Sequence, residues 1–239
     1  MLGGVMAGGL KHWNWGSSHS FGTTSEGWFG LDTGSGGADK LGHAFSSYMI
    51  TNGLTEQLLH QGRSPEQAAL TSALITQAVM IGIEIFDAYS VDYGWSTEDA
   101  VMDLLGSGVA YLRHVTPGLR DRLDFRLEYQ PSGYKGFSPI GDYAGQKYVL
   151  ALKLAGFSAL RDTPLRYLEL QTGYYTRGFS REEQADGLVR SRHGFIGIGL
   201  NLSELLLGQR ARNETGARRA GRLFFEHVQL PSTAARSDW

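Results

Sequence analysis

The chain has 239 residues, of which 41% are hydrophobic and 19% are charged, and its formal net charge is −2. That length is enough for a substantial core in one large domain or two small ones, and the small net charge gives no indication of a nucleic-acid partner. The sequence contains no cysteine, which excludes a disulfide framework, a thiolate metal site, a cysteine nucleophile and a lipid-modified cysteine within these residues.

Residues 1–38 are predicted to form an irregular N-terminal segment that is rich in Gly, Ser, Thr and Trp. Residues 1–10 are apolar like the core of a signal peptide, but they lack a basic leader and a clear cleavage site. They predict either the remnant of a longer signal or anchor, or an apolar arm. Further along, Trp15, Trp28 and Phe29 are expected to pack this segment onto the rest of the protein.

Residues 39–116 are predicted to form a unit of three helices. The first spans about residues 39–60, where apolar side chains fall near one stripe. The third begins with Ser96 as its N-cap and ends before a Pro-Gly pair. Small residues flank Asp103 along this third helix, so Asp103 is expected to face a neighbouring helix instead of water.

The second helix is predicted over about residues 65–89. Ser64 is a natural N-cap, Pro65 fits the first helical position, and Gln67 completes a capping box. The helix is apolar on almost all sides, which predicts burial in protein or in a membrane. Glu84 and the Ser, Thr and Gln content favour the protein interior.

After Pro117, apolar and polar residues alternate with a period of two, which is typical of strands. We predict four strands of an antiparallel sheet with one covered face in residues 117–207. These strands are expected near residues 123–130, 148–154, 165–175 and 195–202. Four strands are too few to close a membrane barrel, which would need further strands or several chains. The polar residues 180–192 are predicted to form a long exposed loop.

Residues 201–207 predict a short helix that is capped by Asn201 or Ser203. Residues 208–239 are predicted to form a basic, flexible tail, with residues 223–230 as a candidate docking helix. The predicted fold class is therefore α+β, in which an N-terminal three-helix unit is followed by a small antiparallel β-sheet and a short C-terminal helix.

Polar side chains gather near the ends of the three predicted helices. His43, Glu84 and Asp103 are the candidate catalytic or metal-ligating residues, because helix capping explains them least well. The supporting residues are Asp39, Lys40, Asp87, Ser96 and Asp99. Separations of three or four residues place several of these groups on shared helix faces, so they could converge at one end of a bundle. Such a set could bind a divalent cation of unknown identity, or perform acid–base chemistry.

The same residues also fit a structural network of ion pairs, which we favour over a site. Asp99 is explained as the partner of Ser96 in a helix cap, and Asp39 as an N-cap. Lys40 would then neutralise Glu84 or the buried aspartate of the third helix. The sequence has no phosphate-binding Gly-rich Lys loop, no Gly-x-Ser-x-Gly elbow and no His-Glu-x-x-His zinc helix. No nucleotide partner is therefore expected, and the cofactor is unknown.

Three motifs follow one another along the helical unit. They are Asp39-Lys-x-x-His43, Glu84-x-x-Asp87 and Gly94-x-Ser96-x-x-Asp99-x-x-x-Asp103-x-x-Gly106. In this order they resemble the pattern of the YfiM-like predicted periplasmic lipoproteins, a family without an assigned activity, over residues 39–110. The first motif alone is also similar to VanZ-like membrane proteins. The lipoprotein resemblance implies a location in the cell envelope, in the periplasm or at the inner face of the outer membrane. The chain departs from the lipoprotein pattern because it has no cysteine.

Two functions from different classes are consistent with these observations. The first is a periplasmic or membrane-associated cell-envelope protein with a structural role or with a membrane or envelope-protein partner. The alternative is a metal- or acid/base-dependent enzyme that acts on an envelope lipid or glycan, with His43, Glu84 and Asp103 in the catalytic roles. A weaker hypothesis is a small membrane-inserted protein, because the second helix is so apolar.

Overall fold

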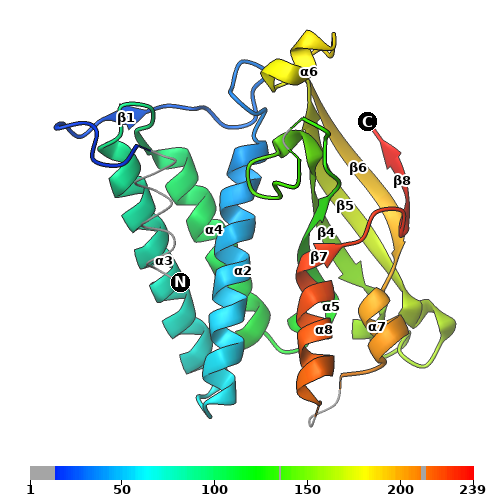
Figure 1. Ribbon diagram of the computed structural model, residues 1–239. Helices are drawn as coiled ribbons and strands as arrows, with labels where there is room; N and C mark the ends of the chain where they lie inside the picture. The colour runs from blue at the N-terminus through cyan, green and yellow to red at the C-terminus, as the bar shows by residue number, and fades with distance from the viewer. Residues whose placement is uncertain (1–13, 135, 211–213) are drawn as a thin grey trace.

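Three long helices stand beside one sheet in the computed structural model, which describes residues 14–134, 136–210 and 214–239 (Figure 1). The helices are α2 (Ala38–His60), α3 (Pro65–Ala88) and α4 (Thr97–Val115). α2 packs on α3 and α4 on one side and on the sheet on the other. The predicted α+β fold, with a three-helix unit followed by a sheet, is confirmed.

Ser64 and Ser96 are the N-caps of α3 and α4, as predicted. Ser64 precedes α3 and accepts a hydrogen bond from the backbone N–H of Gln67 at 3.3 Å. Ser96 precedes α4 and accepts a hydrogen bond from the backbone N–H of Asp99 at 3.2 Å. Each cap satisfies one backbone donor that the first turn of a helix would otherwise leave unpaired.

The described residues form one mixed sheet of six strands. The strands are β3 (Leu123–Tyr129), β4 (Gln146–Lys153), β5 (Leu168–Arg177), β6 (Ser191–Leu200), β7 (Val228–Gln229) and β8 (Ala234–Asp238). Their order is β7-β3-β4-β5-β6-β8, in which β7 is parallel to β3 and every other neighbouring pair is antiparallel. The four predicted strands are confirmed, while β7 and β8 lie in the segment described from the sequence as a flexible tail.

Short elements connect the longer ones. They are β1 (Thr23–Thr24), which pairs in parallel with β2 (Trp95–Ser96), then α5 (Leu119–Arg122) and three 3-10 turns at Tyr143–Gly145, Leu154–Gly156 and Pro164–Tyr167. The pairing of β1 with β2 ties the N-terminal segment to the loop between α3 and α4.

The prediction of a long exposed loop at residues 180–192 is wrong for most of that segment. It contains α6 (Arg181–Ala185), and β6 already begins at Ser191. α6 starts with a reciprocal capping box, in which Ser180 accepts from the Glu183 backbone N–H and Glu183 accepts from the Ser180 backbone N–H. The Ser-x-x-Glu spacing is a capping signal that the charged character of this stretch obscured.

The C-terminal segment is also more ordered than its composition predicts. The short helix is confirmed as α7 (Leu202–Leu207), with Asn201 as its N-cap. It is followed by α8 (Gly216–His227), which begins earlier than the docking helix expected at residues 223–230 and has Thr215 as its N-cap. α8 packs on α7 and β3, so it covers the end of the sheet next to the helical unit.

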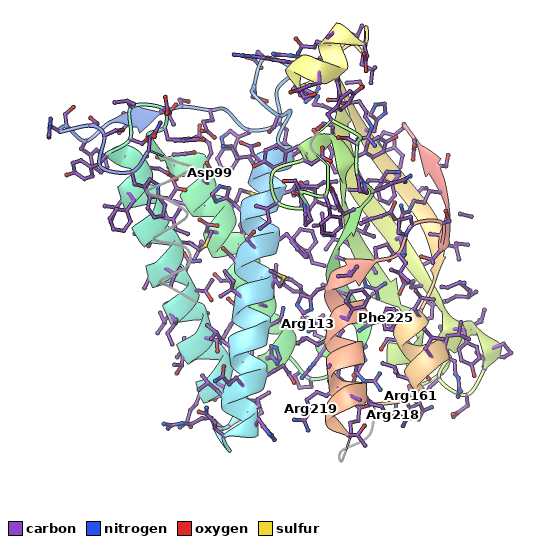
Figure 2. All side chains as sticks on the ribbon, in the orientation of Figure 1. Asp99, Arg113, Arg161, Arg218, Arg219 and Phe225 are labelled. Carbon is purple, nitrogen blue, oxygen red and sulfur yellow. The ribbon has the colours of Figure 1, made fainter. Side chains whose placement is uncertain are left out.

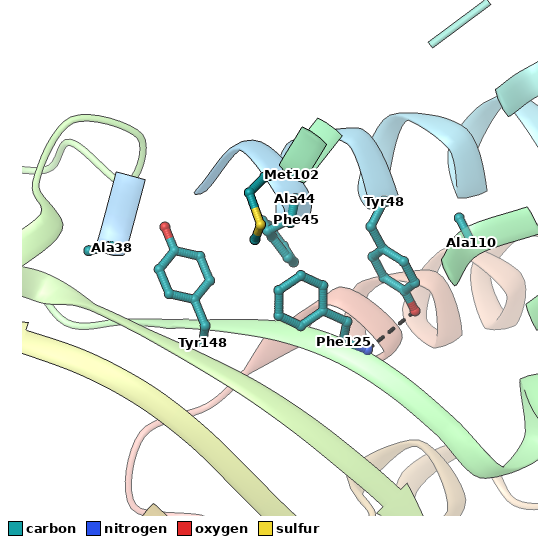
Figure 3. Close-up of a cluster of buried hydrophobic side chains, with 8 residues drawn as sticks. All are labelled: Ala38, Ala44, Phe45, Tyr48, Met102, Ala110, Phe125 and Tyr148. Atoms are coloured by element: carbon teal, nitrogen blue, oxygen red, sulfur yellow. Dashed lines mark hydrogen bonds between the residues drawn. The ribbon is translucent and has the colours of Figure 1, made fainter. Parts of the chain in front are cut away.

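The apolar core lies where α2 meets the sheet. Phe45 and Tyr48 of α2 pack edge-on against Phe125 of β3, with ring centroids 5.6 Å apart in both pairs (Figure 3). Tyr148 of β4 joins this cluster, and the Tyr48 hydroxyl accepts a hydrogen bond from the Phe125 backbone N–H at 3.3 Å. These contacts position α2, and therefore the residues at its N-terminal end.

The opposite face of the sheet carries a buried network of charges. Arg126 donates hydrogen bonds to Asp124 and to Glu169, both at 2.7 Å. Lys153 and Arg113 also donate to Asp124, again at 2.7 Å. Burial alone would raise the pKa of Asp124, but the three neighbouring cations hold it well below its usual range. Asp124 therefore contacts all three buried cations, while Glu169 and Glu226 pair in addition with Arg126 and Arg113.

The outer side of α3 is exposed, which contradicts the prediction that this helix lies in the protein interior. Its buried residues are small, polar or flexible, namely Ala68, Ala69, Ser72, Thr76, Met80, Glu84 and Ala88. Its large apolar side chains, such as Leu74 and Ile81, point outward. Hydropathy alone cannot distinguish the two sides of a helix that is apolar all round.

Candidate functional site

The short connections of the helical unit bring the polar ends of its helices together. α3 runs back along α2 after a tight turn at residues 61–64, so the end of α3 lies beside the start of α2. The loop at residues 89–96 then starts α4 at the same end. Figure 2 shows Asp99 at this end of α4 and Arg113 toward the other end.

His43 is at the centre of the site. Its Nδ1 lies 3.3 Å and 3.4 Å from the two carboxylate oxygens of Asp103 and 4.0 Å from Glu84, while its Nε2 lies 3.7 Å from Asp99. Ser47 donates a hydrogen bond to Asp103 at 2.9 Å and fixes that carboxylate. The His43 side chain is 26% exposed, whereas the carboxylates around it are buried. The three residues that the sequence analysis ranked first therefore lie together.

The cap of α4 differs from the predicted capping box. The backbone N–H of Ser96 donates to Glu84 of α3 at 3.1 Å, and not to Asp99. The Asp99 carboxylate is turned toward Lys40 and His43 instead. The prediction that a cap accounts for the Asp99 side chain is therefore wrong, since only its backbone N–H takes part.

Lys40 organises the second half of the cluster. Its Nζ is buried and pairs with Glu26, with Asp39 at 3.0 Å and with Asp99 at 3.0 Å. These partners are not the two carboxylates that the sequence analysis assigned to it. Glu26 was missed altogether, because it belongs to the irregular N-terminal segment and no local spacing relates it to α2.

Two further predicted residues lie at the edges of the cluster. Asp39 is not an N-cap, because α2 follows Gly37, whose φ of 88° lies in the left-handed region that favours glycine. Its backbone N–H donates to the Ser35 hydroxyl at 3.2 Å, and its carboxylate accepts from the same hydroxyl. Asp87 accepts a hydrogen bond from the Trp15 indole at 2.6 Å, which attaches the N-terminal segment to α3 as expected of its aromatic residues.

The electrostatic environment shifts two of the central groups. Burial would lower the pKa of His43, but the hydrogen bond to Asp103 and the charges of Asp99, Asp103 and Glu84 raise it to about 9. Burial raises the pKa of Glu84 to about 7, even though the Ser96 N–H and the His43 charge act in the opposite direction. At neutral pH the imidazole is therefore protonated, and Glu84 holds a proton far more readily than an exposed glutamate does.

Two groups of atoms in the cluster have the spacing of metal ligands. His43, Glu84 and Asp99 each offer one nitrogen or oxygen, and these atoms lie within 4.8 Å of one another. A second group joins Asp99 to Glu26 and Asp39 at the same spacing. Imidazole and carboxylate together suit zinc, manganese or iron, while carboxylates alone suit harder cations.

A known protein family matches the part of the chain that contains the helical unit. Residues 25–115 match the family described as predicted periplasmic lipoprotein (DUF2279). The match contains the whole helical unit and Glu26, and it leaves the sheet outside. The lipoprotein family supports a cell-envelope location, and its description names no activity. No curated protein and no solved structure matches the chain. The resemblance to VanZ-like membrane proteins stays a prediction.

Proposed function

We propose that this protein is a structural or partner-binding component of the cell envelope, located in the periplasm or at the inner face of the outer membrane. In it, His43 is the cationic centre of a network that holds three helix ends together. The observation that carries this role is the placement of the ring, whose Nδ1 and Nε2 face Asp103 and Asp99 at 3.3 Å and 3.7 Å. Only the protonated imidazole presents a donor on both nitrogens, so the geometry suits an ion-pair centre better than a neutral catalytic base.

Lys40 and His43 together supply the positive charge that compensates the buried carboxylates at this end of the helical unit. Lys40 connects α2 to the N-terminal segment and to α4, while His43 connects α2 to α3 and α4. Because an unpaired charge is costly away from water, each connection depends on both of its partners. The network therefore fixes a rigid end on the helical unit, as a scaffold for a partner requires.

The role of His43 as a cation predicts a particular pH dependence for the variant His43→Gln. The folded-state pKa of His43, about 9, exceeds the ordinary value of 6.5. The stabilisation that the charged imidazole gives the folded protein is therefore fully present below pH 6.5 and is lost as the pH rises through 9. We expect His43→Gln to lower the free energy of unfolding by at most about 3 kcal/mol below pH 6.5 and by much less above pH 9. Urea unfolding across this pH range, with a chelator present, measures the difference.

A matched control is His19→Gln, because His19 is exposed and should show no such pH-dependent difference. A loss of stability in His43→Gln that grows as the pH rises would contradict the proposal. That trend is expected of an imidazole that is held neutral in the folded protein, because protonation in acid would then oppose folding.

The second candidate function is a metal- or acid/base-dependent enzyme acting on an envelope lipid or glycan. The specific observation in its favour is that ligand atoms of His43, Glu84 and Asp99 lie within 4.8 Å of one another, with the imidazole partly exposed. A cation held there would keep an open coordination position toward solvent, as catalytic metal sites do.

Elemental mass spectrometry separates the two functions. If the ion-pair network is correct, wild-type protein purified without chelator should contain far less than one equivalent of zinc, manganese or iron. Near-stoichiometric metal that disappears in His43→Ala would instead favour the enzyme and justify a search for its substrate. Circular dichroism of His43→Ala checks that any loss of metal does not reflect unfolding.

A further inference from the structure

α3 and α4 each present large apolar side chains to solvent, and we call these side chains together the apolar face. Its members are Leu70, Leu74, Ile75, Ile81, Ile85, Phe86, Val101, Leu104, Leu105 and Leu112. Leu74 and Leu104 are 62% and 60% exposed. Among the exposed residues of segments 70–86 and 101–112, none is charged. Exposed apolar side chains in this number on two neighbouring helices indicate a contact with another phase or another molecule.

The inner side of the same helices has the opposite character. Thr51 and Thr76 share a hydrogen bond of 2.9 Å between α2 and α3, and Gln77 donates to Ser107 at 2.7 Å between α3 and α4. Small residues line most of the remaining contacts, so the backbones approach closely, as at Gly106 of α4. A helical bundle in water places its apolar stripe inside. Small inner residues joined by hydrogen bonds, with large apolar residues outside, are the arrangement of helices in lipid.

The dimensions and ends of α3 favour lipid over another protein as the occupant. At about 1.5 Å per residue, the segment 70–86 is about 24 Å long, and its exposed side carries no charge over that length because its one carboxylate, Glu84, is buried. α3 has a mean hydropathy of 1.7 over an 18-residue window, although only 28% of that window is buried. Exposed Phe21, Tyr89 and Tyr93 lie at one end of the face, where aromatic rings suit the headgroup layer, and Arg63 lies at the other.

We infer that membrane lipid covers the apolar face, so that the protein rests on a bilayer through α3 and α4. α2 lies behind these helices, and the sheet is on the far side of α2, away from the lipid (Figure 1). This inference rests on the envelope location given in the proposed function, and it identifies the binding partner as membrane lipid. It is independent of the state of His43, which lies at one end of the helical unit.

Flotation with neutral phosphatidylcholine vesicles tests the inference directly. Wild-type protein should float with the vesicles, and about 1 M sodium chloride should not release it, because salt weakens charge attraction but not apolar burial. The double variant Leu74→Glu/Leu104→Glu should bind at least about tenfold less, because it places two carboxylates in the lipid layer. Both positions are well exposed, so the variant should keep the wild-type far-ultraviolet circular dichroism and thermal unfolding.

The matched control is Ile140→Glu, which adds a carboxylate at a side chain that is 82% exposed and belongs to the connection between β3 and β4. It should float like wild type. Wild-type protein that stays with the unbound fraction would overturn the inference, as would equal flotation of the double variant. A dimer in sedimentation that the double variant abolishes, without flotation of wild type, would assign the face to a second copy. The unfolding of His43→Gln is measured without vesicles, so either proposal can fail alone.

Discussion

Changing Asp124 to Asn should destabilise the protein by about 3–5 kcal/mol, which is the usual cost of removing one partner from a buried ion pair. The substitution keeps the size of the side chain, but it removes the one charge shared by Arg113, Arg126 and Lys153. All of these groups are buried, so water cannot replace the lost carboxylate. Urea unfolding at neutral pH, followed by circular dichroism, measures the loss.

The stability lost in Asp124→Asn should be larger at neutral pH than in acid. Because the folded-state pKa of Asp124 lies below its ordinary value of 3.8, its stabilisation is present above pH 3.8 and is lost as the pH falls through the folded-state value. The difference between wild type and Asp124→Asn should therefore shrink in acid. Asp121→Asn is the control, because Asp121 is 49% exposed and lies 3.8 Å from Arg210, so less than about 1 kcal/mol is expected. Equal losses in the two variants would refute a special role for Asp124.

Gly106→Ala should lower the free energy of unfolding by about 2–3 kcal/mol, in the range of other overpacked sites. A Cβ at this position would lie 1.9 Å from the carbonyl oxygen of Ala44, so α2 and α4 would have to separate. That movement would also displace His43 from the carboxylates of α4. Thermal and urea unfolding measure the loss.

Gly108 provides the control on the same helix. No other atom lies within 4 Å of a Cβ placed there, so Gly108→Ala should raise the stability by about 0.5–1 kcal/mol through helix propensity alone. Two Gly→Ala changes two positions apart should thus have opposite signs. The same sign in both would mean that α2 and α4 do not approach as closely as described.

The position of the candidate site could be predicted because local signals determine where each helix ends. Ser64 and Ser96 start two helices, and tight connections turn the chain back, so the polar motifs at the ends must meet. The pairing within the site could not be predicted in the same way. Lys40 binds Glu26, and Glu84 takes the capping position at Ser96, through contacts that have no characteristic spacing in the sequence.

The parts of the fold that were missed depend on contacts between distant segments. β7 has two residues and β8 has the sequence Ala-Ala-Arg-Ser-Asp, and neither shows an alternating apolar pattern. They are strands because β3 and β6 offer hydrogen-bonding partners along their edges. The orientation of α3 was missed for a related reason, because the small and polar residues on its inner side became visible only with α2 and α4 in place.

The two edges of the sheet are completed by strands that are synthesised after the four central ones. β7 pairs with β3 at one edge and β8 pairs with β6 at the other, and both strands come after α8. Until these residues emerge, a nascent chain carries unpaired edges on β3 and β6, and such edges pair readily with other chains. The sheet therefore has a vulnerable stage during biosynthesis, between the emergence of β6 and that of β7 and β8, at which a holding chaperone would have most effect.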